Sequence, residues 1–185
     1  MSPSRTAFPG FDSPGAGFEA PLEMLAACHG RVERQCETLL RLVPHLAAKG
    51  PDGAAREAAQ NVMRYFDTSA RHHHADEEED LFPALLHAAR EPELAPLREL
   101  VAALKAQHRE LERIWGELRA KLERVALGTL RELDAGEVER MAGLYRSHIA
   151  REEAELLPAA ARMLDLARLD GVGRAMRARR GIRDV

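Results

Sequence analysis

The sequence predicts an all-α protein: an antiparallel up-and-down four-helix bundle with an extended N-terminal arm. Apolar residues recur at three- and four-residue steps over most of the chain, and the alternation typical of strands is missing. Turns containing Pro or Gly divide this pattern into four long segments joined by short connections, so neighbouring helices should run in opposite directions. A chain of 185 residues, 45% of them apolar, is long enough for one such domain.

The arm is predicted over residues 1–20, which are rich in Pro, Gly and Ser. This stretch holds three of the five phenylalanines in the chain, so we expect some of these rings to lie against the body of the protein: Phe8, Phe11 and Phe18. The bundle is predicted over residues 21–170. A basic C-terminal tail is predicted over 171–185, its arginine-rich run forming a solvated helix end.

The first helix should begin at Pro21, a residue suited to a first turn, and be closed by Pro44 and the turn at 49–53. The other three helices are predicted over about 54–89, 96–127 and 134–169, and they end at or before helix-breaking residues: Pro92, Gly128 and Gly171.

Composition excludes several classes of partner. The formal net charge of −3 gives no basic surface for nucleic acid or phospholipid. Neither a signal peptide nor an apolar run long enough for a membrane span is visible. Cys28 and Cys36 lie eight residues apart on one predicted helix, about 12 Å, which is too far for a disulfide. Reduced cysteines favour a cytoplasmic location.

An internal repeat relates the two halves of the chain. HHHADEEEDLFPAL (72–85) and SHIAREEAELLPAA (147–160) share seven of fourteen positions, and LAACHGRVERQCETL (25–39) and LKAQHRELERIWGEL (104–118) share six of fifteen. The offsets of 75 and 79 residues differ by about one helical turn. The chain therefore reads as a duplicated helical hairpin, each copy carrying a lone His followed by a His-x-x-x-Glu.

This spacing has a geometric meaning. Residues four apart on an α-helix share a face, so a His-x-x-x-Glu presents an imidazole nitrogen and a carboxylate oxygen to one point. The repeat predicts four imidazoles and two carboxylates in the bundle core, a set that suits a pair of first-row transition ions, iron foremost. The predicted metal ligands are His29, His73, Glu77, His108, His148 and Glu152.

Neighbouring polar residues have simpler interpretations. The repeat selects His73 over its neighbours, because His72 aligns with Ser147 and His74 with Ile149. Asp76, Glu79 and Asp80 are expected on a solvated helix face. Glu33 and Glu112, one turn after the lone histidines, are expected to support ligands or form salt bridges rather than bind metal.

The six residues and their spacing, with Leu81-Phe82-Pro83 after the first motif and Pro158 after the second, resemble the hemerythrin-like (HHE cation-binding) domain family over roughly residues 22–165. The resemblance implies an up-and-down four-helix bundle holding two iron ions, oxo- or hydroxo-bridged. Glu77 and Glu152 would bridge the irons, with His29 and His73 on one and His108 and His148 on the other.

One departure narrows the function that the resemblance implies. Oxygen-carrying members have a fifth histidine one turn before the position of His108, where this chain has Leu104. The chain therefore resembles the members linked to nitric oxide and oxidative stress more than the oxygen carriers. We expect a di-iron protein that binds or reacts with O2, NO or peroxide, or that senses or supplies iron.

Two alternatives stay open. The same ligands suit a metal-binding or regulatory module that holds Zn, Mn or mixed metals without turnover. A metal-free interaction bundle predicts instead that His73→Ala leaves thermal stability unchanged with and without iron. Enzymatic turnover and the oligomeric state are not predicted by the sequence.

Overall fold

The computed structural model describes residues 17–182, and every regular element within them is helical. Two short segments, η1 and η2, are π-helical, and the rest are α-helices. In order the elements are α1 (Pro21–Lys49), α2 (Gly53–Asp67), α3 (Ser69–Ala75), η1 (Asp76–Leu81), α4 (Phe82–Ala88), α5 (Leu94–Ala126), α6 (Ala135–Arg151), η2 (Glu152–Leu156), α7 (Leu157–Met163) and α8 (Leu166–Arg179). The all-helical prediction is confirmed.

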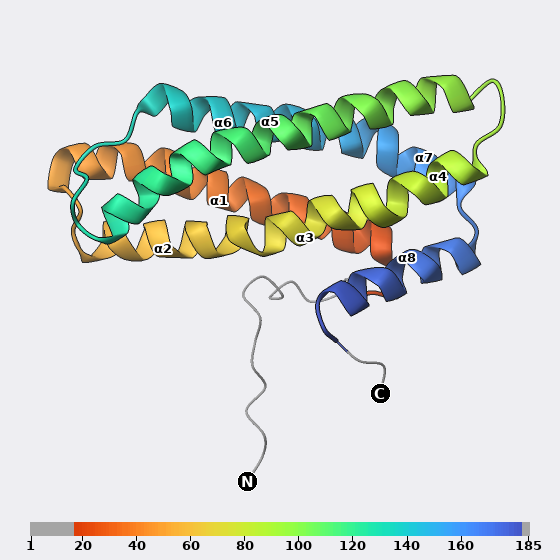
Figure 1. The fold of residues 1–185 in the computed structure, drawn as a ribbon, viewed down its shortest axis with the longest axis horizontal. Helices are drawn as coiled ribbons and strands as arrows, with labels where there is room; N and C mark the ends of the chain where they lie inside the picture. The colour runs from red at the N-terminus through yellow and green to blue at the C-terminus, as the bar shows by residue number, and fades with distance from the viewer. Residues whose placement is uncertain (1–16, 183–185) are drawn as a thin grey trace, which may run out of the picture.

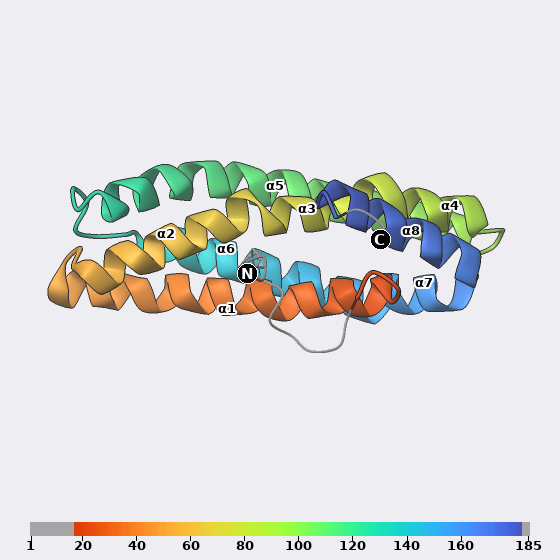
Figure 2. The same cartoon turned by 90° about the horizontal axis from the view of Figure 1, so that it is seen from below.

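Most of these segments join end to end into long rods that lie lengthwise side by side (Figure 1). One rod is α1, the next runs from α2 to α4, a third is α5, and the last runs from α6 to α7. The helix α1 packs against α2 and α6, and α5 packs against the same two helices. Helix α8 lies outside this arrangement, against α1 and η1 (Figure 2).

Local signals in the sequence fix several helix ends. The side chains of Asp52, Asp134 and Asp165 each accept a hydrogen bond from a backbone N–H in the first turn of α2, α6 and α8. Gly50 and Gly128 follow α1 and α5 with φ of 68° and 77°, a left-handed conformation that glycine adopts without steric cost.

Three predicted boundaries were wrong. Pro44 lies inside α1, which continues to Lys49 because the loss of one hydrogen bond near a helix end is tolerated. The predicted helix over 54–89 is broken at Thr68, whose φ and ψ are −126° and −74°. The last rod ends at Met163, and α8 then runs through Gly171, where a stop was predicted.

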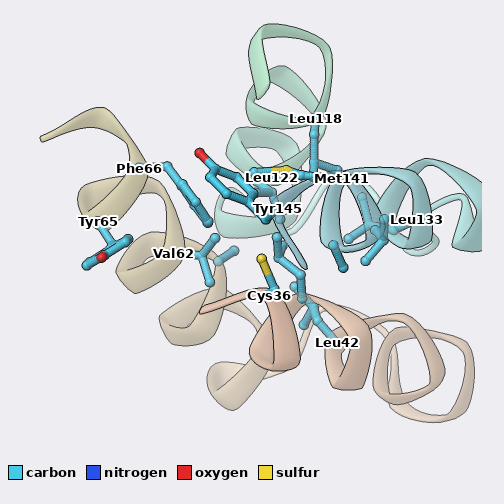
Figure 3. Packing of buried hydrophobic residues seen from close by; sticks show 14 of the residues in the cluster. Cys36, Leu42, Val62, Tyr65, Phe66, Leu118, Leu122, Leu133, Met141 and Tyr145 are labelled. Carbon is cyan, nitrogen blue, oxygen red and sulfur yellow. The ribbon is translucent and has the colours of Figure 1, made fainter. Parts of the chain in front are cut away.

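The core consists of two apolar clusters, one toward each end of the rods. The first includes Val62 and Phe66 of α2, Cys36 of α1 and Tyr145 of α6, which turn toward one another between the helices (Figure 3). The second includes Leu25, Phe82 and Leu104. Between them the four rods contribute polar residues, and this layer holds the candidate site.

Other predictions concern single residues. Cys28 and Cys36 are buried and free in α1, as predicted. The ring of Phe18 packs against α8, below the guanidinium groups of Arg177 and Arg180. Phe8 and Phe11 lie outside the described residues. Within residues 17–182, no helix combines the length and apolar character needed to span a membrane.

Candidate metal centre

The layer between the two clusters contains the six predicted metal ligands, none more than 2% exposed: His29, His73, Glu77, His108, His148 and Glu152. They come from α1, α3, η1, α5, α6 and η2, so every rod contributes. Burying this many ionisable groups is unfavourable unless they are paired or bind a metal. The six residues therefore form a potential metal site.

Both carboxylates lie in π-helical turns. The N–H of Phe82 donates to the carbonyl of Glu77, and that of Leu157 donates to the carbonyl of Glu152, each five residues back. Pro83 and Pro158 follow immediately and have no N–H to donate. Single π turns are frequent at functional sites because they re-aim side chains. The two halves of the repeat thus share the same local distortion at the same place.

One group of ligand atoms comes from His29, His73, Glu77 and Glu152, all within 4.8 Å of one another. His29 Nε2 lies 3.1 Å from Glu152 Oε2, and His73 Nε2 lies 3.5 Å from Glu77 Oε1. The rings of His29 and His73 meet edge to face at 5.1 Å.

A second group comes from Glu77, His108, His148 and Glu152, within the same limit. His148 Nε2 lies 3.0 Å from Glu152 Oε1, His108 Nε2 lies 3.4 Å from Glu77 Oε2, and the two Nε2 atoms are 3.1 Å apart. The two groups share both carboxylates. Both carboxylates therefore lie among the histidines of both groups.

Several of these buried atoms lack a hydrogen-bond partner among the described residues. They are both carboxylate oxygens of Glu77 and of Glu152, Nε2 of His29 and Nδ1 of His73. The short approach of His29 to Glu152 therefore lacks the alignment of a hydrogen bond. Unpaired buried polar atoms are costly and rare, whereas lone pairs converging on a common point are what a cation requires. The residues fit a metal.

Outer partners orient three of the imidazoles. His29 Nδ1 lies 3.1 Å from Glu153 Oε1, His108 Nδ1 lies 2.7 Å from Glu78 Oε1, and His148 Nδ1 lies 3.1 Å from the Gln107 side-chain oxygen. A histidine that donates from Nδ1 keeps the lone pair of Nε2 for a metal.

Residues 20–160 match the family model of the hemerythrin HHE cation-binding domain. The chain belongs to this family. It is also 32% identical over 169 residues to an uncharacterized protein of Haemophilus influenzae, an alignment that covers 91% of this chain and 95% of the relative. The match makes this a hemerythrin-like, cation-binding helical domain with a potential metal site.

The repeat had paired Glu78 with Glu153 without giving either a role. In this hemerythrin-like domain each carboxylate supports the lone histidine of the other half: Glu78 contacts His108 and Glu153 contacts His29. The sequence does show that the two halves of the repeat carry the same residue, Glu, at these matching positions. Only the contacts between segments far apart in the chain show that each carboxylate contacts a histidine.

His74 was set aside by the sequence argument, yet it is buried. Its ring stacks on that of His108 at 3.9 Å, and its Nε2 has no hydrogen-bond partner among the described residues. Its ring nitrogens lie within 4.8 Å of those of His108 and His148. His74 lies in α3 next to His73, one residue before the end of that helix. His72 is half-buried and outside these groups.

In the metal-free protein, their surroundings shift the pKa values of Glu77 and Glu152 in opposite directions. Burial and the nearby charge of Glu152 hold the pKa of Glu77 well above its usual range. Burial acts the same way on Glu152, but the close approach of the His148 and His29 imidazoles outweighs it and lowers the pKa of Glu152. Burial and the neighbouring His29 lower the pKa of His73, which keeps this imidazole neutral. A neutral imidazole is the form that binds metal.

The acidic run is not uniformly solvated. Asp76 was predicted on a solvated face, but it is 0% exposed and pairs with arginines of the C-terminal region. Glu33 and Glu112 are exposed and outside the groups of ligand atoms. Leu104 is fully buried in the second apolar cluster and offers no ligand atom.

Proposed function

We propose that this hemerythrin-like protein holds two iron ions and uses them to bind or react with a small ligand, O2, NO or peroxide, or to sense or supply iron under nitric oxide or oxidative stress. The observation that supports this most is the pair of four-residue groups sharing Glu77 and Glu152. We further propose the antiparallel up-and-down four-helix bundle of the family as its framework, and a cytoplasmic location in keeping with its free cysteines. The division into arm (1–20), bundle (21–170) and basic tail (171–185) stays a prediction.

In this proposal Glu77 and Glu152 lie between the two irons, His29 and His73 hold one, and His108 and His148 hold the other. Bound iron would supply redox chemistry and coordination positions open to a small ligand. The chain itself supplies the rest. The two apolar clusters exclude water from the layer, and Glu78 and Glu153 hold the imidazoles of His108 and His29 in place.

Beside the metal layer lies a small pocket of about 20 Å³, lined by His74, Tyr145 and Trp115, among others. That volume accommodates roughly one water-sized molecule. None of the six proposed ligands lines this pocket, so the proposal of a small ligand rests on the buried His and Glu groups themselves.

The test is anaerobic reconstitution of the untagged protein with ferrous iron, followed by elemental analysis. The proposal predicts about two irons per chain and an absorption change on addition of NO or peroxide. Clearly fewer than two irons would contradict the di-iron assignment. Binding of two metals with no reaction toward NO or peroxide would favour the alternative, a metal-binding or regulatory module without turnover. The nitrogen and oxygen donors of this site also suit Zn or Mn.

A further inference from the structure

The C-terminal helix α8 makes an ionic contact with the segment that carries Glu77. Asp76, directly before Glu77, is 0% exposed, and a buried carboxylate is stable only when its charge is paired. Arg179 Nη1 lies 2.5 Å from Asp76 Oδ1, and Arg180 Nη2 lies 2.6 Å from Asp76 Oδ2. Two guanidinium groups thus hold both oxygens of one carboxylate.

The contact extends along the π-helix. Arg179 Nη2 also lies 2.8 Å from Glu79 Oε2 and 2.8 Å from Asp80 Oδ2. Three of the six residues of η1 are therefore tied to one arginine pair at the end of α8. π turns are rare and occur mostly as single turns within α-helices, and these ion pairs come from outside the helix that contains this one.

The position of α8 is itself fixed by packing. Val172 and Met176 are buried in the second apolar cluster. A side chain at Gly173 would collide with the carbonyl oxygen of Phe18, so glycine permits the close approach of the arm. The Phe18 ring lies 5.8 Å below the Arg180 guanidinium, which is 9% exposed. Arm and α8 together present the arginines to η1.

Among the described residues, the other half of the repeat has no equivalent of the arginine-bound Asp76 carboxylate. Asp76 aligns with Arg151, which forms an exposed ion pair with Glu155 at 3.2 Å. Within the described residues, the position before Glu152 therefore carries no buried carboxylate paired with arginines of a separate helix. The two halves of the repeat therefore differ at this position, and within residues 17–182 only the segment of Glu77 is held by arginines of α8.

We propose that Arg179 and Arg180 are positioning residues, which hold η1 in the conformation that turns Glu77 into the metal layer and so slow the loss of metal. The inference rests on the proposed function. Helix α8 then acts as a latch, by which we mean that Arg179 and Arg180 at its end hold η1 in place on one side of the site. The sequence had predicted a solvated tail here.

The experiment compares iron release to a chelator from the loaded full-length protein and from the double variant Arg179→Gln/Arg180→Gln. The matched control is Arg168→Gln/Arg174→Gln, which removes two exposed arginines of the same helix whose ion pairs among residues 17–182 are with Asp165 and Asp170. We expect release about tenfold faster or more in the first variant and unchanged in the control. Equal rates in both would overturn the proposal.

Loss of both arginines leaves the buried Asp76 carboxylate unpaired, which destabilises the fold of this variant. The triple variant Asp76→Asn/Arg179→Gln/Arg180→Gln removes the buried charge along with its partners. It is expected to fold and still release iron about tenfold faster. Release at the wild-type rate would contradict the latch.

Amide hydrogen exchange separates this proposal from the proposed function. In metal-free protein the variants should exchange faster in residues 76–81 and unchanged in 152–156. If the wild type holds no iron but this contrast appears, the positioning role stands and the di-iron function fails. If iron binds but exchange rises equally in both segments, α8 is merely structural and the latch is refuted.

Discussion

At the scale of single residues, the fold gives three adjacent histidines three different environments. His73 is in the group with Glu77, His74 stacks on His108, and His72 stays half-buried outside both groups. The repeat favoured His73 because only this histidine has an identical counterpart, His148. Nothing in the repeat could reveal that His74 is buried, since Ile149 occupies the matching position.

His73→Ala should lower the iron content of the reconstituted protein by about half, because one position loses an imidazole while the other keeps two. His72→Ala is the matched control, one residue away, and should keep the full content. Elemental analysis of both variants checks this. Equal iron in the two would remove His73 from the ligand set.

Glu153→Gln should weaken iron binding by about 10–100-fold without changing the content at saturation, because the carboxylate acts on His29 Nδ1 rather than on the metal. Competition with a chelator of known affinity measures the change. Glu155→Gln, in the same turn but paired only with surface Arg151, is the control. A Glu153 variant that behaves like this control would show that the contact is unimportant.

At the scale of elements, the hydrophobic pattern predicted where the helices lie. It did not predict where they depart from regular α-helical geometry or continue past a helix-breaking residue. α5 covers Leu94–Ala126, close to the expected 96–127. The π turns η1 and η2 were not predicted, because they depend on burying Glu77 and Glu152 rather than on local preference. The path of α8 through Gly171 was missed for a similar reason: packing against Phe18 and the second cluster outweighs the poor helix propensity of glycine.

Packing between α2 and its neighbours depends on Phe66, whose ring lies 4.9 Å from that of Trp115 and 5.4 Å from that of Tyr145. Phe66→Ala should lower the free energy of unfolding by about 3–5 kcal/mol, since it leaves a cavity in the first cluster. Leu127→Ala, at an exposed position, should change it by less than about 0.5 kcal/mol. Urea denaturation measures both. A loss of below about 1 kcal/mol for Phe66→Ala would contradict this packing.

At the scale of the whole molecule, a polar layer separates the two apolar clusters, so a metal bound in this layer would couple its binding to folding. Unpaired oxygens of Glu77 and Glu152 are unfavourable in the metal-free core, and a cation that binds only the folded chain removes that cost. The four rods contribute to one site, so metal should stabilise the entire bundle rather than one hairpin.

Iron at about a hundred times its dissociation constant should stabilise the fold by about 2.7 kcal/mol. For a chain of this length, that corresponds to a rise of roughly 5–10 °C in the unfolding midpoint. Calorimetry of loaded and chelator-treated protein measures the difference. The same midpoint in both samples would favour a metal-free interaction bundle.

The central claim is that two irons share Glu77 and Glu152, and X-ray absorption at the iron edge tests it most directly. The loaded wild type should show iron–iron scattering at roughly 3.5–4 Å, the separation of paired metals that share ligands. Glu77→Gln should weaken or remove this feature, while Glu155→Gln, at an exposed position of the other π turn, should preserve it. Iron bound without iron–iron scattering in the wild type would contradict the account.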